Sequence, residues 1–365
     1  MRWLFIILLA TARIVLPEAI PHSHNGFITA PASKKYISPS ILGQIFIGTN
    51  YRKEWQTPVT MPVFNISKTN FKIVKIGGGL QTISLDMVDD NNRELTLRSV
   101  DKNVLSLKKY QQNIFIHSII QDNVSGSYPY AELSVYDIAH AAGVPAGERH
   151  LYFVPDDTAF GVYRPIMANK VFILINTQPQ QEKAITTIQM LDTLKQSKLF
   201  YVDEREYLKA RLVDWLVADW DRHIDQFRWV EKRTDSGVGF FVVPRDHDQA
   251  FFRSNGLLVK IVGRPHLNRF NSSGSGIDDL SEKTRDLDKQ FTGHLQKEDW
   301  EKIIKQFQHN VTDSVIQVAL KKQPKEIFAI NGNELIGILI SRRDGLLKHA
   351  MEYYSFLSKL TNDLH

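Results

Sequence analysis

The sequence predicts an α+β protein of two lobes, in which a β-rich first lobe carries one helix and the second lobe is mostly helical. Strand-like runs separated by turn residues dominate the stretch between residues 71 and 97. Apolar residues at helical spacing dominate the second half, over 204–219, 299–322 and 333–361. A length of 365 residues suits about two domains, and a cleft between two lobes is a favoured ligand site.

The chain divides into four segments by local composition. Residues 1–19 are expected to be a secretion signal, because a basic residue precedes a short apolar run and an Ala-Thr-Ala cleavage pattern; a buried helix or an interfacial anchor is the alternative. The protein is therefore expected to be exported, with no transmembrane span in the mature chain. Residues 20–65 are expected to form an arm or a small subdomain, 66–175 the β-rich N-lobe and 176–365 the helical C-lobe.

In the N-lobe, short runs rich in β-branched and aromatic residues predict the strands. One helix is expected over 129–142, because Ala131, Val135 and Ile138 share a face and Gly143 follows. The strands are expected over 71–76, 80–88, 95–97, 151–154, 161–163 and 171–174. The first three are expected to pair as an antiparallel meander.

In the C-lobe, Leu208, Leu212 and Trp215 lie on one face of the helix expected over 204–219. A short strand pair follows this helix, and after it comes a polar stretch whose Ser and Gly residues favour a mobile loop. These segments are 227–231 with 240–243 for the strand pair and 268–289 for the loop.

The composition excludes several classes of site. No cysteine occurs among the 365 residues, so the protein has no disulfide framework, no Cys-ligated zinc or iron–sulfur centre, no thiol nucleophile and no lipidated N-terminal cysteine. A net charge of +5 is mild for this length and does not favour nucleic acid as a partner. Any metal is expected to be a hard cation held by oxygen atoms.

The densest group of ionisable residues lies over 219–229, where a helix is expected to end and a hairpin to begin. Asp221 on such a turn can accept a proton from a hydroxyl nucleophile, and Arg222 and His223 follow it directly. The amide oxygen of Gln226 can reach a divalent cation, since Mg²⁺ and Mn²⁺ prefer oxygen ligands. A solvated loop held by Arg–Asp pairs is the alternative.

Two more carboxylates, Asp246 and Asp248, follow the apolar strand expected over 240–243. The end of a strand is a rigid place for a metal ligand, and two carboxylates spaced by one residue can bind one or two cations. Only one hairpin separates them from Asp221 in the sequence, which favours a shared site.

In the N-lobe, a glycine turn and a basic strand end are candidates for phosphate contact. Glycine lets the backbone approach a phosphate closely, although a simple hairpin turn explains the run equally well. Arg98 or Lys102 could pair with Glu132 or Asp137 on the following helix, as in the Lys–Glu clamp of phosphoryl-transfer folds; a surface ion pair is the alternative. The glycines are Gly77, Gly78 and Gly79.

The order of these motifs resembles the atypical protein-kinase-like fold, and most closely the CotH-type secreted kinases, with similar modules in uncharacterised bacterial envelope proteins. Asp221-Arg222-His223 with Gln226 resembles their D-R-H-x-x-N loop. The run from Pro244 to Asp248 with Phe251 resembles their W-D-x-D-x-x-F element. The resemblance covers roughly residues 66–360.

The resemblance implies a secreted phosphotransferase that moves a phosphoryl group from ATP to a hydroxyl acceptor, with Mg²⁺ or Mn²⁺ as cofactor. Asp221 would be the catalytic base within the triplet that it forms with Arg222 and His223, and Gln226 would replace the metal-binding Asn. The metal ligands would be Asp246 and, second, Asp248. The partners would be a nucleotide and an unknown protein or small-molecule acceptor, and an envelope protein is a further candidate.

The same resemblance assigns the phosphate-binding residues. Arg98 or Lys102 would hold the α- and β-phosphates with Glu132 bracing it, and the glycines at 77–79 would cover them. Arg98 stands where a Lys is expected, Gln226 is longer than Asn, and the glycines are unspaced. Two alternatives therefore stay open: a catalytically silent kinase-like module that binds a protein or glycan, and a metal-dependent phosphoesterase.

Overall fold

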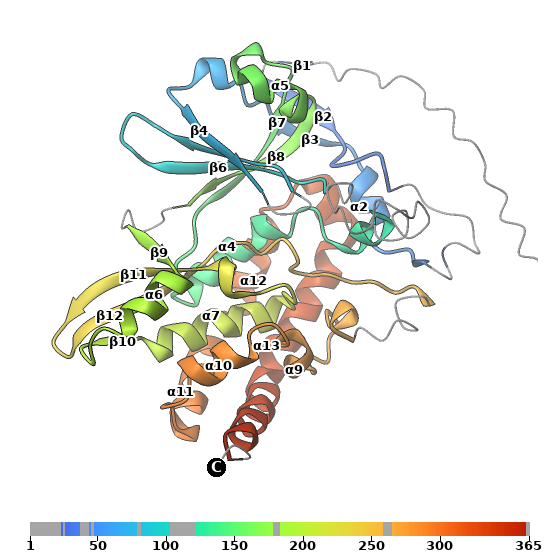
Figure 1. Cartoon of the computed structure of the whole chain (residues 1–365). Coiled ribbons are helices and arrows are strands. Elements are labelled where there is room, and N and C mark those ends of the chain that lie inside the picture. The colour runs from blue at the N-terminus through green and yellow to red at the C-terminus, as the bar shows by residue number, and fades with distance from the viewer. Residues whose placement is uncertain are drawn as a thin grey trace, which may run out of the picture.

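The computed structural model describes residues 23–24, 26–36, 44, 47–78, 82–102, 121–177, 183–257 and 265–362. Within them the predicted α+β class is confirmed: the sheets lie mainly in the N-terminal half and the helices mainly in the C-terminal half (Figure 1). The expected signal at 1–19 and Gly79 lie outside the described residues. In the part that is described, no helix is both long and apolar enough to span a membrane.

A three-stranded antiparallel sheet, in the order β1-β2-β3, begins the described chain. Its strands are β1 (Ser23–His24), β2 (Phe27–Ala30) and β3 (Val59–Pro62), and helix α2 (Arg52–Gln56) precedes β3. Trp55 on α2 is fully buried, and its indole N–H donates to the carbonyl of Ser127 at 2.9 Å. Buried apolar residues of this region, among them Ile28, Tyr51 and Val59, belong to the main apolar core.

Glu54, beside Trp55, is a buried carboxylate whose Oε1 accepts a hydrogen bond from Asn331 Nδ2 at 2.6 Å. Burial raises the pKa of Glu54. When a carboxyl pKa is higher in the fold than in the unfolded chain, the protonated form stabilises the fold at low pH. This contribution is lost as the pH rises through the folded-state pKa, because the buried carboxylate then becomes charged. We therefore expect Glu54→Gln to raise the free energy of unfolding at about pH 7.5 but not at about pH 3.5, as measured by urea denaturation. A variant less stable than the wild type at the higher pH contradicts this expectation.

The N-lobe is built on a five-stranded antiparallel sheet in the order β4-β5-β6-β8-β7. The expected meander over its first three strands is confirmed. Leu85, Leu97 and Phe172 are buried in an apolar cluster of their own on this sheet. The strands are β4 (Lys72–Gly77), β5 (Ser84–Val88), β6 (Glu94–Ser99), β7 (Arg149–Val154) and β8 (Lys170–Asn176).

Helix α4 (Ala131–Ala141) lies between β6 and β7 in the chain and matches the helix expected there. Ala131, Val135 and Ile138 are buried, as their shared face predicts. The helix packs against β7 and against helix α12 (Asp313–Leu320) of the C-lobe. It therefore connects the two lobes at the edge of the N-lobe sheet that β7 forms.

The strand expected over 161–163 is wrong. These residues belong to a 3-10 helix, η5 (Thr158–Tyr163), which continues into helix α5 (Arg164–Met167). The side chain of Asp157 accepts a hydrogen bond from the N–H of Ala159 at 2.8 Å. This cap starts the first helical turn, and the chain then bends at Gly161, whose φ of +55° does not fit a strand either.

A four-stranded sheet, in the order β10-β12-β11-β9, packs on helix α7 (Glu204–Val217) through β12. The helix starts at Asp203, whose side chain accepts the N–H of Glu206 at 3.0 Å, and ends at Ala218 in the left-handed region (φ +54°). The expected helix and the expected strand pair are both confirmed. The strands are β9 (Ala184–Thr186), β10 (Phe200–Val202), β11 (Phe227–Thr234) and β12 (Gly237–Pro244), with helix α6 (Thr187–Leu194) after β9.

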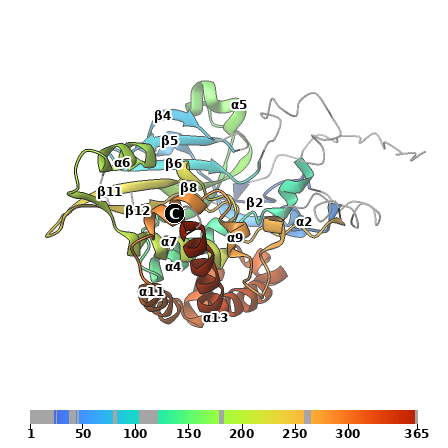
Figure 2. The same cartoon turned by 60° about the horizontal axis from the view of Figure 1, so that its bottom comes forward.

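The described chain closes with helices α9 (Ile277–Leu280), α10 (Arg285–Phe291), α11 (Lys297–Asn310), α12 (Asp313–Leu320) and α13 (Lys325–Asn362). The helix expected over 299–322 is divided, because Thr312 caps a new helix by accepting the N–H of Val315 at 3.2 Å. The segment expected as a loop, 268–289, contains α9 and α10. Figure 2 shows α11 and α13 below the sheets, and α13 contacts α9, α11 and α12.

Candidate active site

A cleft of about 330 Å³ lies between the five-stranded sheet and the β11–β12 ribbon. Strands β4, β5, β6 and β8 contribute one wall, and residues around the start of β11 and the end of β12 contribute the other. Residues predicted from the sequence that line this cleft are Gly77, Gly78, Arg98, Gln226 and Asp246. The glycine turn, the basic strand end and two metal-ligand candidates therefore face one space, although they are far apart in the sequence.

Two cations of the N-lobe meet two carboxylates of the C-lobe here: Arg98 and Asp246 line the cleft, and Lys102 and Asp248 border a small enclosed space that Arg98 also lines. Arg98, near the end of β6, contacts Asp246 and donates to Asp248 Oδ2 at 3.0 Å. The ammonium nitrogen of Lys102 lies 2.9 Å from Asp248 Oδ2, and the lysine side chain is only 4% exposed. The four charges compensate one another, as a mostly buried group of charges requires.

Burial and neighbouring charges act differently on the two carboxylates. Burial raises the pKa of Asp246 to about 6, against the charge of Arg98. Burial favours a raised pKa at Asp248 as well, but the charges of Lys102 and Arg98 outweigh it and hold this pKa below its usual range. Asp248 is therefore an anion at any ordinary pH, whereas Asp246 changes its charge slightly below neutral pH.

The residues at the cleft suit a hard divalent cation. Gln226 Oε1 is buried and accepts no hydrogen bond from the described residues, and Asp246 lines the same cleft. Amide and carboxylate oxygens are the ligands that Mg²⁺ and Mn²⁺ prefer. The backbone of Asp246 is left-handed (φ +48°), a conformation that is uncommon outside glycine and that collects at functional sites. Gln226 and Asp246 are therefore the leading ligand candidates.

Asp221, the candidate base, is not among the described residues that line the cleft. Its carboxylate contacts the ammonium group of Lys283, which comes 62 residues later, and its side chain is 27% exposed. Lys283 stands between α9 and α10 and also lies over the ring of Trp220, 5.1 Å from the ring centroid. The structure thus joins Asp221 to a lysine that the sequence did not connect with it.

Arg222 is fully buried and does not line the cleft. Its Nη2 and Nε donate to the two carboxylate oxygens of Asp214 at 2.7 and 3.0 Å. Its Nη1 donates to the carbonyl of Arg245 at 3.1 Å. Arg222 therefore links helix α7 to the backbone that immediately precedes Asp246, and its role in this structure is to hold the two segments together.

His223 begins a 3-10 helix, η6 (Ile224–Gln226), that shapes the loop between α7 and β11. Its Nδ1 accepts the N–H of Asp225 at 3.3 Å, and its carbonyl accepts the N–H of Gln226 at 2.9 Å. These contacts hold Gln226 at the end of a single tight turn. His223 accordingly positions the metal-ligand candidate rather than lining the cleft itself.

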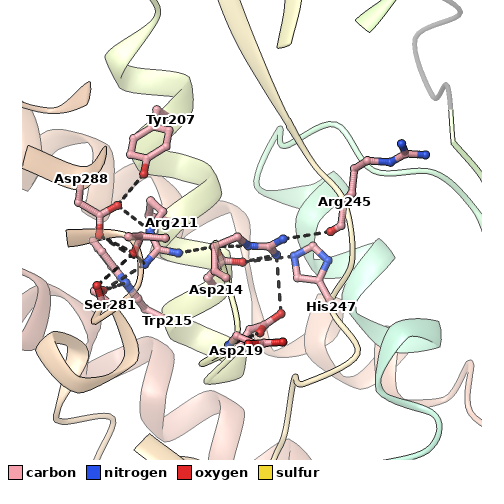
Figure 3. Close-up of polar contacts among 12 residues, drawn as sticks. Tyr207, Arg211, Asp214, Trp215, Asp219, Arg245, His247, Ser281 and Asp288 are labelled. Atoms are coloured by element: carbon pink, nitrogen blue, oxygen red, sulfur yellow. Dashed lines mark hydrogen bonds and ion pairs between the residues drawn. The ribbon is translucent and has the colours of Figure 1, made fainter. Parts of the chain in front are cut away.

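Figure 3 shows the network of buried charges that continues into the C-lobe. Arg211 donates to Asp214 at 2.6 Å and to Asp288 at 2.8 Å, and these three side chains are at most 1% exposed. The hydroxyl of Tyr207 also donates to Asp288, at 2.7 Å. Each buried charge has a partner, so the network fixes α7 against the segment around α10 and supports the loop that follows α7.

Asp214, Asp219 and His247 lie close enough to share a cation, with ligand atoms within 4.8 Å of one another. The guanidinium of Arg222 already donates to both oxygens of Asp214 and lies 3.7 Å from Asp219. Burial and the charge of Arg222 lower the pKa of His247 to about 4. Because an arginine takes the place that a metal would need, this cluster is a structural ion network.

Glu132 pairs with Arg149 on β7 and not with the two cations that it was expected to brace. Arg149 Nε donates to Glu132 Oε2 at 3.2 Å, and both side chains are at most 5% exposed. Arg149 lines the cleft, so Glu132 braces another cation of the same site. Arg98, Lys102, Glu132 and Asp248 do border one enclosed space of about 20 Å³, room for about one water molecule.

The glycine turn has a steric requirement of its own. Gly78 has a positive φ of +120°, and a Cβ there would lie 2.1 Å from the carbonyl oxygen of Thr82. The turn between β4 and β5 therefore needs glycine at this position whether or not a phosphate binds. Since Gly77 and Gly78 also line the cleft, a hairpin turn and a phosphate contact are compatible roles.

Arg342 on α13 anchors the end of α7, immediately before the loop that carries Asp221. It donates to the carbonyls of Trp215 at 2.5 Å, Leu216 at 2.7 Å and Arg269 at 2.7 Å. A cation at this end of a helix satisfies carbonyls that lack intrahelical partners and is attracted by the helix dipole. Burial lowers the pKa of Arg342 to about 9.

Comparisons with known proteins return structures but no sequence relatives. No protein-family model matches the chain, and no curated protein matches it significantly. The chain is similar to the crystal structure of the Helicobacter pylori proinflammatory kinase CtkA, at 12% identity over 78% of this chain and 95% of that chain, with a TM-score of 0.43. It is also similar to the Rio2 kinase–ADP/Mg²⁺–phosphoaspartate complex from Chaetomium thermophilum, at 11% identity over 76% and 73% of the two chains, with a TM-score of 0.33. At this identity the likeness concerns the fold alone.

Proposed function

We propose that this protein is an exported kinase-like phosphotransferase of the CotH type that uses ATP and Mg²⁺ or Mn²⁺ to phosphorylate a hydroxyl group. The observation that carries the proposal is the contact of Arg98 and Lys102 with Asp246 and Asp248, a group in which Arg98 and Asp246 line the cleft. Phosphoryl transfer requires cations for the phosphates and carboxylates for the metal at a single place, and these residues supply both. The signal-like pattern of residues 1–19 supports export.

In the proposed reaction, Asp246 and Gln226 would hold a divalent cation that neutralises charge on the phosphate oxygens. With a cation beside them, Asp246 and Asp248 no longer need Arg98 and Lys102 as partners, and both basic side chains can turn to phosphate. The guanidinium fork of Arg98 matches two phosphate oxygens, whereas Lys102 acts as a point charge. The same four side chains can thus compensate one another or divide between cation and phosphate.

Asp221 would orient the acceptor hydroxyl and take its proton. For this, the hydroxyl must replace the ammonium group of Lys283 at the carboxylate. Arg222, buried against Asp214, holds the loop from behind while the exchange takes place. The displaced lysine would remain beside the acceptor oxygen, where a cation can stabilise developing negative charge.

A catalytically silent kinase-like module that binds a protein or glycan is the second candidate. It is favoured by the contacts of Asp221 with Lys283 and of Asp246 with Arg98, which give each carboxylate a cation within the chain. A phosphoesterase is disfavoured, because a shared cation would need Asp221 and Asp246 together and only Asp246 lines the cleft.

The purified protein is expected to transfer the γ-phosphate of ATP to itself or to an added acceptor when Mg²⁺ or Mn²⁺ is present, and to stop when EDTA removes the cation. Asp221→Asn should lower the transfer rate by about 10² to 10⁴-fold, the range of general-base catalysis, while the affinity for nucleotide stays unchanged. Transfer is measured with radiolabelled ATP, and nucleotide binding by calorimetry.

The matched control for that experiment is Asp235→Asn, which neutralises an exposed carboxylate at the tip of the β11–β12 hairpin. This variant should keep the wild-type rate. Absence of nucleotide binding with either cation overturns the proposed function. Nucleotide binding without transfer in the wild type, unaltered by Asp221→Asn, favours the silent module.

A further inference from the structure

The wall of the cleft formed by β11 and β12 presents two arginines on one face. Arg228 pairs across the ribbon with Val243, and the N–H of Arg245 donates to the carbonyl of Gln226 at 2.8 Å, which extends the pairing beyond β12. Side chains two residues apart on a strand share a face, so Arg245 lies on the same face as Val243. Arg228 and Arg245 both line the cleft and are diagonal neighbours, within reach of each other for long side chains.

Neither guanidinium has a carboxylate partner among the described residues. Arg228 Nη1 donates to the backbone carbonyls of Asp225 and Phe227 at 2.8 and 2.9 Å. In Figure 3 the side chain of Arg245 points away from the buried network, which reaches this residue through its carbonyl oxygen. The Asp225 carboxylate lies 3.7 Å from His223 and is largely exposed.

The cleft carries an excess of positive charge, and these two arginines account for it. Five basic and three acidic side chains line the cleft, so positive charge is in excess there. The other basic side chains have carboxylate partners: Arg98 with Asp246 and Asp248, Arg149 with Glu132, and Lys75 with Asp86. Arg228 and Arg245 therefore remain on the β11–β12 wall, and the lining carboxylate beside them is the largely exposed Asp225.

Two like charges held together are unfavourable unless an anion joins them. Both arginines are partly buried and line the same concave site. The Asp225 carboxylate attracts Arg228, but it is largely exposed, and no described carboxylate forms an ion pair with either arginine. A concave site that keeps such a pair attracts an anion that gains from both charges.

We infer that Arg228 and Arg245 form a second anion subsite, separate from the Arg98 group, which binds a phosphate group of the phosphoryl donor's phosphate chain. The inference rests on the proposed function for the identity of the donor. Guanidinium forks bind phosphate oxygens in pairs. Sites that bind a nucleobase are mostly apolar. The described lining of the cleft has few apolar side chains, namely Ile175, Val243 and Pro244. The anionic part of the donor therefore accounts better for the arginine pair than its base does.

The test is calorimetric titration of the full chain with sodium tripolyphosphate in EDTA, where neither metal nor catalysis contributes. The double variant Arg228→Gln, Arg245→Gln should bind at least about tenfold more weakly than the wild type, since each lost charge-assisted contact costs of that order. The matched control, Arg205→Gln with Arg233→Gln, removes the same charge from exposed positions outside the cleft. It should change the affinity by less than about twofold.

A second arm repeats the titration with Mg-ATP and so distinguishes the source of the phosphate. Equal losses for tripolyphosphate and ATP support the subsite and place a nucleotide's own phosphates there. A loss for tripolyphosphate alone supports a subsite for an inorganic phosphate chain. A loss for ATP alone assigns the pair to the nucleoside and overturns the inference, as do unchanged affinities or an equal loss in the control. Tripolyphosphate binding by a protein that transfers no phosphate would sink the proposed function and leave the subsite standing.

Discussion

Asp246→Asn is expected to remove most of the catalytic rate while making the folded protein slightly more stable. The amide keeps the shape of the side chain but loses the charge that holds a divalent cation, so the rate should fall about a hundred- to a thousandfold. Burial raises the pKa of Asp246 to about 6, so at neutral pH the ionised carboxylate costs more free energy in the fold than in the unfolded chain. A neutral side chain removes this penalty, and the free energy of unfolding in EDTA should rise by about 1 kcal/mol.

Asp248→Asn is the matched comparison, and its effect on stability should have the opposite sign. Lys102 and Arg98 outweigh the effect of burial and hold the pKa of Asp248 below its usual range, so the fold favours the charged form. Neutralising it should lower the free energy of unfolding by about 3 kcal/mol, as expected when a buried ion pair loses one partner. Urea denaturation of both variants in the same buffer decides the question. Two variants destabilised alike would show that the two carboxylates do not differ in this way.

The largest loss of stability is expected from Asp214→Ala. Asp214 is fully buried between Arg211 and Arg222, which donate to it at 2.6 and 2.7 Å. Removing its carboxylate leaves two buried guanidinium groups without the negative charge that Asp214 supplies. Breaking a buried ion pair by removing one partner lowers the free energy of unfolding by about 3 to 5 kcal/mol. A loss of that size approaches the whole stability of many domains, so a large part of the variant should be unfolded at about 37 °C.

The control for this prediction is Asp192→Ala, which breaks a surface pair with Lys195 whose side chains are 63% and 76% exposed. Exposed pairs contribute up to about 1 kcal/mol, and the control should unfold close to the wild type. Circular dichroism during heating and urea titration gives both values. An Asp214→Ala protein as stable as the control contradicts the role assigned to the buried network.

Regular elements with one strong period could be predicted from the sequence. Leu208, Leu212 and Trp215 recur at helical spacing, and all three are buried in α7. The strand pair that follows was equally predictable. The division of the helix expected over 299–322 could not be predicted in this way. A single capping contact at Thr312 decides where the second helix begins, and the spacing of apolar residues does not reveal such a contact.

The pairings that make the site were beyond local patterns. The proximity of Arg98 to Asp246 was expected only through the resemblance to kinases, and the contact of Lys283 with Asp221 was not expected at all. Both depend on how separate elements pack, and sequence spacing does not encode that packing. One signal was available: once the hairpin is aligned, Arg228 and Arg245 fall on one face of the ribbon.

The anchoring of α7 by Arg342 has a consequence for folding during synthesis on the ribosome. Arg342 follows Trp215, whose carbonyl it binds, by 127 residues, so the ribosome releases the loop that carries Asp221 long before it releases the side chain that holds α7 in place. A chain whose translation stops before α13 would contain all of the proposed catalytic residues and still lack their support. Any shortened version of this protein intended for biochemistry should therefore keep the closing helix, although that helix carries no residue of the proposed reaction.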